Sequence, residues 1–183
     1  MALLYAIVDS ENELNRMVEL SVPIIQFRAK SGQKLKKLPN CQSKIIINDS
    51  LEEAERLGAW GAHLGQEDLQ RYDESVLLNR KVKLGISTHS DEEYQRALIY
   101  KPEYLGFGPI FKTSSKDITI EPHGVNKLAE YVSRSSIPVV AIGGINFENS
   151  KELLRTKIWS VAVIQALKDM KDEQIKDWMK ALC

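Results

Sequence analysis

Short apolar segments rich in Ile, Val and Leu recur along the chain, separated by charged segments. Within the apolar segments, apolar and polar residues do not alternate as they do in half-exposed antiparallel strands. The pattern therefore predicts parallel strands that are covered on both faces. We expect eight such strands, at residues 3–8, 23–27, 44–47, 61–64, 82–86, 103–107, 138–142 and 159–164.

The charged segments between these strands are compatible with helices, at residues 50–57, 68–79, 91–100, 126–133 and 146–154. A steady alternation of strand and helix is typical of a barrel or of a doubly wound sheet. Eight units favour the barrel, so the predicted fold is a compact (β/α)8 TIM barrel. Residues 31–43 contain Gly32 and Pro39 and show little apolar periodicity, so we expect a vestigial second helix. Residues 165–182 predict the closing helix, with Trp178 and Leu182 on its packed face.

The composition limits the classes of function. A chain of 183 residues that is 43% hydrophobic has material for one sizeable core, so we expect a single domain over residues 1–183. Twenty-five Lys and Arg residues balance twenty-five Asp and Glu residues, so no overall charge favours a nucleic acid or an anionic membrane as partner. We therefore expect small-molecule substrates that bind at a local site.

The expected location is cytoplasmic. No apolar run approaches the roughly 20 residues of a membrane helix, and the apolar start ends at Asp9, too early for a signal peptide. Cys41 and Cys183 are far apart in the sequence and suggest reduced thiols.

Polar residues gather where the predicted strands end. The carboxyl ends of the strands form the active-site rim of a (β/α)8 barrel, so these residues are the candidates for chemistry. They are Gln26, Arg28, Lys30, Asn48, Asp49, His63, Gln66, Asp68, Ser87, His89, Lys112, Thr113, Ser114, Ser115, Lys116, Gly143, Gly144 and Gln165.

Asp49 and Asp68 follow neighbouring strands and would project toward each other. Two carboxylates flanked by Asn and Gln suit a hard cation, Mg²⁺ above all. The alternative is that each aspartate only caps the helix that follows it.

Arg28 and Lys30 alternate at a strand end, and Lys116 comes from a separate loop. Cations that converge beside Mg²⁺ are typical of a diphosphate site, although each is also compatible with a solvated surface charge. Gly143 and Gly144 would allow a phosphate to approach the backbone closely, or would form only a tight turn. No nucleophile with a neighbouring base is evident, and His63 is interpreted as structural because it lies within an apolar strand.

Six motifs in order along the chain together resemble the thiamine-phosphate synthase family, which also contains thiazole tautomerases. They are QFRAK (26–30), IND (47–49), HLGQED (63–68), GISTHS (85–90), GPIFKTSSK (108–116) and AIGGI (141–145). The resemblance implies a transferase that joins hydroxymethylpyrimidine diphosphate to a thiazole phosphate, giving thiamine phosphate and pyrophosphate.

The resemblance also implies a role for each matching position. Gln26, Arg28, Lys30 and Asn48 would hold the pyrimidine diphosphate, Asp49 and Asp68 the Mg²⁺, and Ser87 the diphosphate or the pyrimidine. Thr113, Ser115 and Lys116 would contact the thiazole side and the leaving group. Gly144 and the backbone near Ile164 and Gln165 would bind the thiazole phosphate. Arg28, Lys30, Ser87 and Lys116 are the expected catalytic residues, and a homo-oligomer is compatible with this assignment.

The sequence also departs from the family's pattern. Gln165 stands where the family usually has Ser, and residues 156–159 replace a run of small residues before the last strand. Two alternatives therefore stay open: a thiazole tautomerase, in which His89 would be the acid–base residue, and a ligand-binding homologue without catalytic activity. Against the tautomerase, this chain keeps both aspartates.

Overall fold

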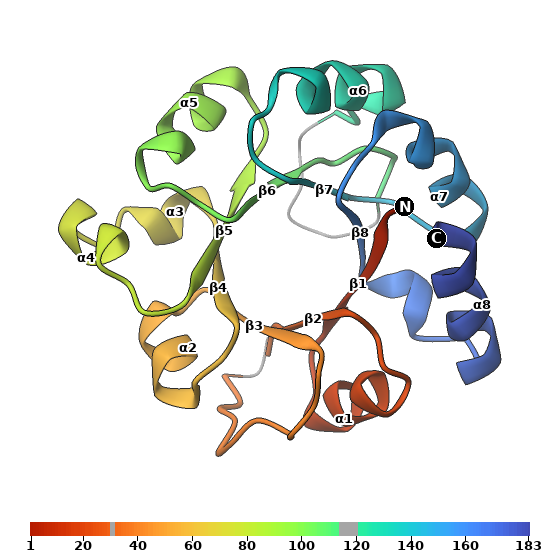
Figure 1. The fold of residues 1–183 in the computed structure, drawn as a ribbon, viewed down its shortest axis with the longest axis horizontal. Coiled ribbons are helices and arrows are strands. Elements are labelled where there is room, and N and C mark those ends of the chain that lie inside the picture. Colours follow the sequence, from red (N-terminus) through yellow and green to blue (C-terminus); the bar gives the residue numbers. More distant parts are fainter. Residues whose placement is uncertain (30–31, 114–120) are drawn as a thin grey trace.

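The computed structural model describes residues 1–29, 32–113 and 121–183, which form the closed parallel (β/α)8 barrel predicted from the sequence (Figure 1). Each strand pairs in parallel with the next one along the chain, and β1 also pairs with β8, which closes the barrel. The strands are β1 (Leu3–Val8), β2 (Ile24–Phe27), β3 (Lys44–Asn48), β4 (Gly61–Leu64), β5 (Lys83–Thr88), β6 (Tyr104–Phe107), β7 (Val139–Ile142) and β8 (Ser160–Val163).

Helices surround the barrel on the outside (Figure 1). Three of them begin after a serine, Ser10, Ser50 or Ser90, whose hydroxyl accepts a backbone N–H from the first turn, a favoured helix start. The helices are α1 (Glu11–Glu19), α2 (Leu51–Leu57), α3 (Gln66–Leu69), α4 (Glu74–Leu78), α5 (Asp91–Ile99), α6 (Gly124–Arg134), α7 (Phe147–Leu153) and α8 (Asp172–Leu182), with 3₁₀ turns at Leu154–Thr156 and Gln165–Leu167.

The helices differ from the prediction in three places. Residues 68–79 do not form one helix, because the chain turns between α3 and α4, where the Tyr72 hydroxyl accepts the backbone N–H of Leu51 at 3.0 Å. The closing helix starts only at Asp172, since Lys171 is extended and its N–H is capped by the Gln174 side chain at 2.8 Å. Helix α1 forms where none was predicted. The vestigial second helix is confirmed, because the described residues between β2 and β3 contain no helix.

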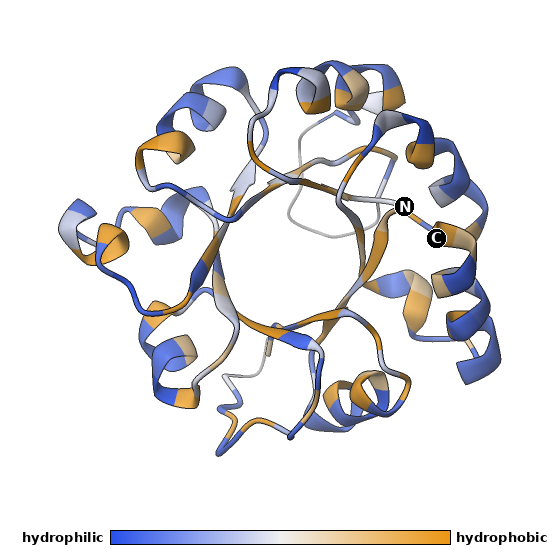
Figure 2. Ribbon diagram, viewed as in Figure 1, coloured by the Kyte–Doolittle hydropathy of each residue, from blue (hydrophilic) through white to orange (hydrophobic). Residues whose placement is uncertain are grey.

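The hydrophobic core has two parts. The larger part lies between the strands and the helices, and Figure 2 shows hydrophobic residues along the strands and mixed hydropathy on the helices. The smaller part fills the inside of the barrel and consists of Tyr5, Ile7, Ile24, Ile46, Tyr104, Val140 and Ala162.

Gly85 on β5 makes room inside the barrel for the ring of Tyr104 on β6. A Cβ atom at Gly85 would lie 2.0 Å from Tyr104 Cζ, so no larger residue fits while the ring stays in place. Gly106 on β6 is less crowded, because the nearest atom to a Cβ added there would be His63 Cε1, at 3.4 Å. The Tyr104 ring thus packs directly against the backbone of Gly85, in the part of the core that fills the inside of the barrel.

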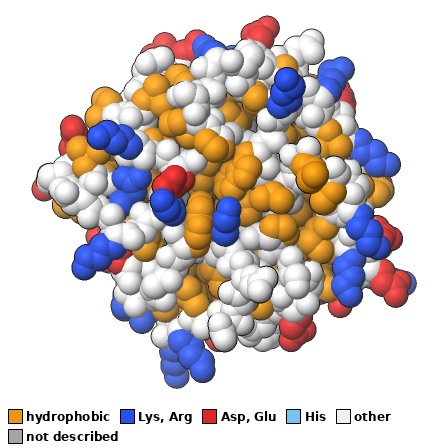
Figure 3. Space-filling view, in the orientation of Figure 1, with side chains coloured by type: hydrophobic (Ala, Val, Ile, Leu, Met, Phe, Trp, Pro, Cys, Tyr) orange, Lys and Arg blue, Asp and Glu red, His pale blue; other side chains and the backbone are white. Residues whose placement is uncertain are grey.

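Two tryptophans close the end of the barrel at which the strands begin. Trp60 and Trp159 directly precede β4 and β8, and their ring centroids are 6.5 Å apart. Lys44 Nζ lies 5.1 Å from each of these two ring centroids, within the range of a cation–π contact. Trp159 also packs on Tyr104, at 5.6 Å between centroids. Hydrophobic side chains likewise gather over the barrel, at the centre of the face shown in Figure 3.

Helix α8 joins the two ends of the chain. Trp178 and Leu182 are buried, as predicted, and Trp178 Nε1 donates to Ser150 Oγ at 2.9 Å. The N–H of Ala2 donates to the carbonyl of Leu182 at 2.9 Å, so the termini lie close together (Figure 1). Within the described ranges, none of the helices has the length and apolar character needed to span a membrane.

Candidate active site

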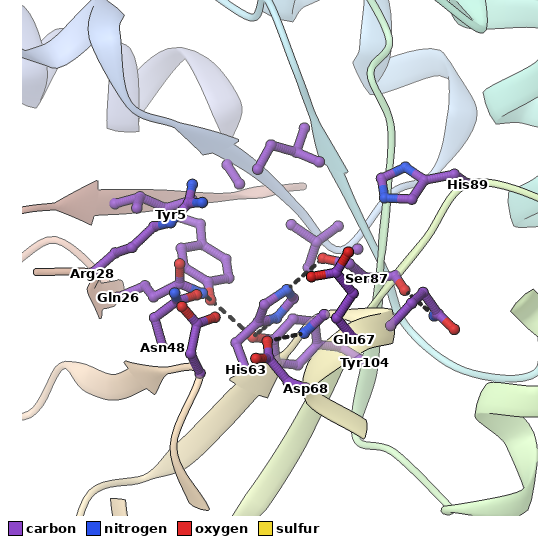
Figure 4. A pocket seen from close by; sticks show the side chains of 18 of the residues that line it. Tyr5, Gln26, Arg28, Asn48, His63, Glu67, Asp68, Ser87, His89 and Tyr104 are labelled. Atoms are coloured by element: carbon purple, nitrogen blue, oxygen red, sulfur yellow. Dashed lines mark hydrogen bonds between the residues drawn. The ribbon is translucent and has the colours of Figure 1, made fainter. Parts of the chain in front are cut away.

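A cavity of about 500 Å³ opens where the strands end, and it collects many of the predicted polar residues (Figure 4). Its wall is built from the last residues of several strands and from the loops that follow them. The candidate residues from the sequence that line it are Gln26, Arg28, Asn48, Asp49, His63, Gln66, Asp68, Ser87 and His89. Four strand ends, those of β2, β3, β4 and β5, thus contribute to one cavity.

Other predicted site residues are not part of this wall. Thr113, Gly144, Ile164 and Gln165 are described but do not line the cavity. Lys30, Ser115 and Lys116 lie outside the described residues. The roles of all seven stay predictions.

A chain of hydrogen bonds crosses the floor of the cavity (Figure 4). Gln26 Nε2 donates to the Tyr5 hydroxyl at 2.9 Å, and the hydroxyls of Tyr5 and Tyr104 are 2.8 Å apart. His63 connects this pair to Ser87: Nδ1 lies 2.9 Å from the Tyr104 hydroxyl, and Nε2 lies 2.8 Å from Ser87 Oγ. Side chains from five strands are therefore joined end to end.

Burial keeps this chain uncharged. Burial, reinforced by the positive charge of Arg28, lowers the pKa of His63 to about 4, and burial raises the pKa of both Tyr5 and Tyr104 above the ordinary value for tyrosine. At neutral pH, the His63 ring is neutral, with one nitrogen donating and the other accepting. His63 lines the cavity and holds the hydroxyl of Ser87 there, while its interpretation as a structural residue stays a prediction.

Asp68 lies close enough to Asp49 to raise the pKa of the Asp49 carboxyl. Partial desolvation and the neighbouring Asp68 carboxylate raise the pKa of Asp49 to about 6, against the opposing effect of Arg28 and Arg71. Asp49 does not cap α2, because Ser50 does so. Asp68 does contribute to the start of α3, since its Oδ2 accepts the N–H of Gly65 at 2.8 Å, but it also lines the cavity. The capping alternative is therefore wrong for Asp49 and only part of the role of Asp68.

This pair of carboxylates fits a hard divalent cation. Across residues 1–29, 32–113 and 121–183, no group of three or more His, Cys, Asp or Glu side chains is arranged to hold a metal ion. Two carboxylates are nevertheless enough for Mg²⁺, which usually keeps several waters and is shared with substrate phosphates.

Two arginines lie beside the aspartates. Arg28 follows β2 and lines the cavity, where it is exposed. Arg71 follows α3, and its Nη2 donates both to the Asp68 carboxylate and to the carbonyl oxygen of Asp49. Negative and positive groups are thus placed side by side at this part of the rim, as a site for a metal-bound polyanion requires.

Gly143 and Gly144 pack against the segment after β6. Both have a positive φ, and a Cβ atom at Gly144 would lie 2.4 Å from the carbonyl oxygen of Lys112. The N–H of Phe111 donates to the carbonyl of Gly143 at 3.0 Å. The glycine pair thus forms a turn with a close backbone contact, and its role in binding a phosphate stays a prediction.

The remaining histidines differ in their surroundings. His89 lines the cavity, and its Nδ1 donates to the carbonyl of Gly108 at 2.5 Å. The ring of His123 stacks on Phe107, at 4.7 Å between centroids, and is not part of the cavity wall.

Sequence reasoning missed Tyr5, Tyr104 and Arg71. The signal for Tyr104 was the glycine at 85, since a glycine inside a buried strand often marks a close approach by another group. The signal for Arg71 was its spacing from Asp68, because residues three apart meet on a helical turn. For Tyr5 there was no signal, because the residues of the strand at 3–8 are apolar on both faces and the pattern does not show which face is turned into the barrel.

Comparisons with known proteins agree with the geometry. The family model described as thiamine monophosphate synthase matches residues 4–167. A thiamine-phosphate synthase of Neisseria meningitidis is 39% identical over 89% of this chain and 85% of its own length. One of Salmonella choleraesuis is 35% identical over 97% of this chain and 87% of its own length.

Solved structures extend this similarity to the fold. A thiamine phosphate pyrophosphorylase from Pyrococcus furiosus has a TM-score of 0.77 and 25% identity, covering 98% of this chain and 94% of its own. An N-(5′-phosphoribosyl)anthranilate isomerase from the same organism has a TM-score of 0.69 at 15% identity, covering 100% of this chain and 98% of its own, and shares the fold alone.

Proposed function

The chain belongs to the thiamine monophosphate synthase family, and from that premise we propose how its cavity carries out the coupling reaction. The protein is a transferase that joins hydroxymethylpyrimidine diphosphate to a thiazole phosphate and releases pyrophosphate. The convergence of Gln26, Arg28, Asn48, Asp49, Asp68 and Ser87 on one cavity is the observation that carries the assignment of residues.

The diphosphate binds beside the acidic pair. Arg28 contacts its oxygens, and we place Lys30 and Lys116 with it because converging cations suit a polyanion. Asp49 and Asp68 would hold Mg²⁺, which when bound neutralises charge on the diphosphate.

The pyrimidine lies deeper, over the chain of hydrogen bonds. Gln26, Asn48 and Ser87 provide polar groups at the cavity wall, and the rings of Tyr5 and Tyr104, which meet edge to face with centroids 6.0 Å apart, provide aromatic surface for the pyrimidine ring. Because His63 holds the Ser87 hydroxyl in place, the polar contacts are preorganised before the substrate binds.

In the reaction, the bond between the pyrimidine methylene carbon and the diphosphate oxygen breaks, and its electron pair leaves with pyrophosphate. The thiazole nitrogen then supplies the electron pair of the new carbon–nitrogen bond. No protein nucleophile is needed, and the positive charge that develops on the pyrimidine side is balanced by the nearby anions. Thr113, Ser115 and Lys116 would contact the thiazole side and the leaving group, and Gly144 with the backbone near Ile164 and Gln165 would bind the thiazole phosphate.

The surroundings of the protein are part of the same proposal. Residues 1–183 form one domain that acts in the cytoplasm, where Cys41 and Cys183, both free in the structure, stay reduced. The substrates are small molecules, without a role for nucleic acid or membrane, and a homo-oligomer is compatible with the fold.

A single assay tests the function. The purified protein is incubated with both precursors, with and without Mg²⁺, and thiamine phosphate is measured. Product is expected only with Mg²⁺. Asp49→Ala and Asp68→Ala should each lower turnover by about 10²-fold or more, because each removes a carboxylate from the rim and leaves the core intact.

Glu74→Ala is the matched control, since Glu74 is an exposed carboxylate on α4 outside the cavity wall. Normal turnover in either aspartate variant would remove the metal assignment. Absence of product under all conditions would remove the function.

A further inference from the structure

Arg71 links the two aspartates of the cavity. Its Nη2 donates to Asp68 Oδ1, and the same nitrogen donates to the carbonyl oxygen of Asp49 at 2.7 Å. Asp49 has a φ of 63°, a left-handed conformation that is uncommon for a residue other than glycine. One guanidinium therefore contacts both segments that carry the acidic pair.

Arg71 contacts the carboxylate oxygen of Asp68 that accepts no backbone N–H among the described residues. Oδ2 of Asp68 accepts the N–H of Gly65, so Oδ1 is the oxygen that faces Arg71. The Arg71 side chain is 58% exposed, so it is held by this contact rather than by packing and is able to turn away. Its guanidinium carries a positive charge and offers several N–H donors.

A divalent cation that binds Asp49 and Asp68 meets two positive charges, because Arg71 donates to Asp68 and Arg28 lines the same cavity. Repulsion between like charges at such short range opposes its binding. A diphosphate changes this balance, because its negative charge offsets both arginines and its oxygens offer Arg71 new acceptors.

We propose that Arg71 is an internal counter-ion that weakens the binding of a divalent cation to the free protein and so makes metal binding depend on the diphosphate. The inference rests on the proposed function, since it takes Asp49 and Asp68 as the metal ligands. Arg71 is a positioning residue in this scheme: it acts on the order of binding through the acidic pair.

The test measures Mn²⁺ binding directly, by the electron paramagnetic resonance signal of free Mn²⁺, for wild type, Arg71→Ala and Arg71→Lys. Each protein is titrated with Mn²⁺ alone and again with inorganic pyrophosphate, with protein-free samples to correct for the Mn²⁺–pyrophosphate complex. Arg71→Ala should bind Mn²⁺ alone about three- to tenfold more tightly than wild type, because a nearby positive charge is gone. Pyrophosphate should then enhance its binding less than it does for wild type.

Arg71→Lys keeps the charge and should resemble wild type. Arg56→Ala is the matched control, because Arg56 has the same kind of contacts away from the cavity wall. It pairs with Glu53 three residues earlier, and its Nη2 donates to the carbonyl of Leu35 at 2.6 Å. This variant should bind Mn²⁺ as wild type does.

Three outcomes overturn the inference. If wild type binds Mn²⁺ with pyrophosphate but Arg71→Ala binds Mn²⁺ alone no more tightly, Arg71 is only a brace and the proposed function stands. If Arg71→Lys behaves like Arg71→Ala, its charge is not the cause. If wild type binds no Mn²⁺ under either condition, the metal assignment itself fails, and the inference fails with it.

Discussion

His89 lies in the cavity wall, where its Nδ1 is already bonded to the carbonyl of Gly108. The thiazole nitrogen needs no base in the coupling reaction, whereas a tautomerase must move a proton, and loss of a general acid–base residue typically costs about 10²- to 10⁴-fold. We therefore predict that His89→Ala loses less than about tenfold in coupling activity, well below that range. The measurement is thiamine phosphate formation with saturating precursors and Mg²⁺.

Ser87→Ala is the comparison for this residue, because Ser87 also lines the cavity but belongs to the chain of hydrogen bonds. It should lose more activity than His89→Ala. A protein that isomerises the thiazole carboxylate, never couples it and depends on His89 would contradict the synthase assignment.

At the scale of secondary-structure elements, the fit of β5 against β6 depends on the absence of a side chain at Gly85. In Gly85→Ala, the new Cβ would overlap the Tyr104 ring, so either the ring or a strand has to move. We expect a loss of about 1–3 kcal/mol in the free energy of unfolding, the usual cost of overpacking a core. Urea unfolding followed by circular dichroism measures it.

Gly106→Ala is the matched control, because Gly106 lies on the neighbouring strand and its new Cβ would have only ordinary contacts. It should unfold close to wild type. If both variants lose the same free energy of unfolding, the contact between Gly85 and the Tyr104 ring does not control the packing of these strands.

The sequence predicted the strands better than the helices, for physical reasons. Each strand is buried on both faces, so its apolar run was visible without knowledge of its neighbours. The break after α3 depends on a contact between Tyr72 and Leu51, which are far apart in sequence, and no local pattern carries it. The start of α8 was misplaced because 165–182 is amphipathic throughout, whereas the structure uses its first part for a 3₁₀ turn.

The candidate site follows the same distinction. Residues at the strand ends, such as Asp49 and Ser87, could be named because their place in a barrel is fixed by the topology. The connection from Gln26 through Tyr5 to Tyr104 could not, because a strand covered on both faces does not show which residues turn inward. Only the register between the strands shows that these three side chains meet.

At the scale of the whole molecule, α8 packs beside β1 and α7, near the place where β1 pairs with β8 to close the barrel. Trp178 is fully buried and donates a hydrogen bond to Ser150, so Trp178→Ala leaves a large cavity and removes that hydrogen bond. We expect a loss of about 3–5 kcal/mol in the free energy of unfolding, measured by urea denaturation.

Lys176→Ala is the control on the same helix, because Lys176 is exposed. Its unfolding free energy should stay within about 0.5 kcal/mol of wild type. If the two variants are equally stable, α8 is not part of the cooperative unit that unfolds with the barrel.

Trp60 and Trp159, with Lys44 against their rings, lie at the end of the barrel where the strands begin, so among the described residues the cavity has its opening at the end where the strands finish. Both substrates must enter through it, and both products must leave by the same route. In the proposed arrangement the pyrimidine lies deeper than the thiazole phosphate, so we expect the pyrimidine diphosphate to bind first. Pyrophosphate that re-enters the cavity meets the same cations as the incoming diphosphate, and we expect it to compete with that substrate for the free enzyme.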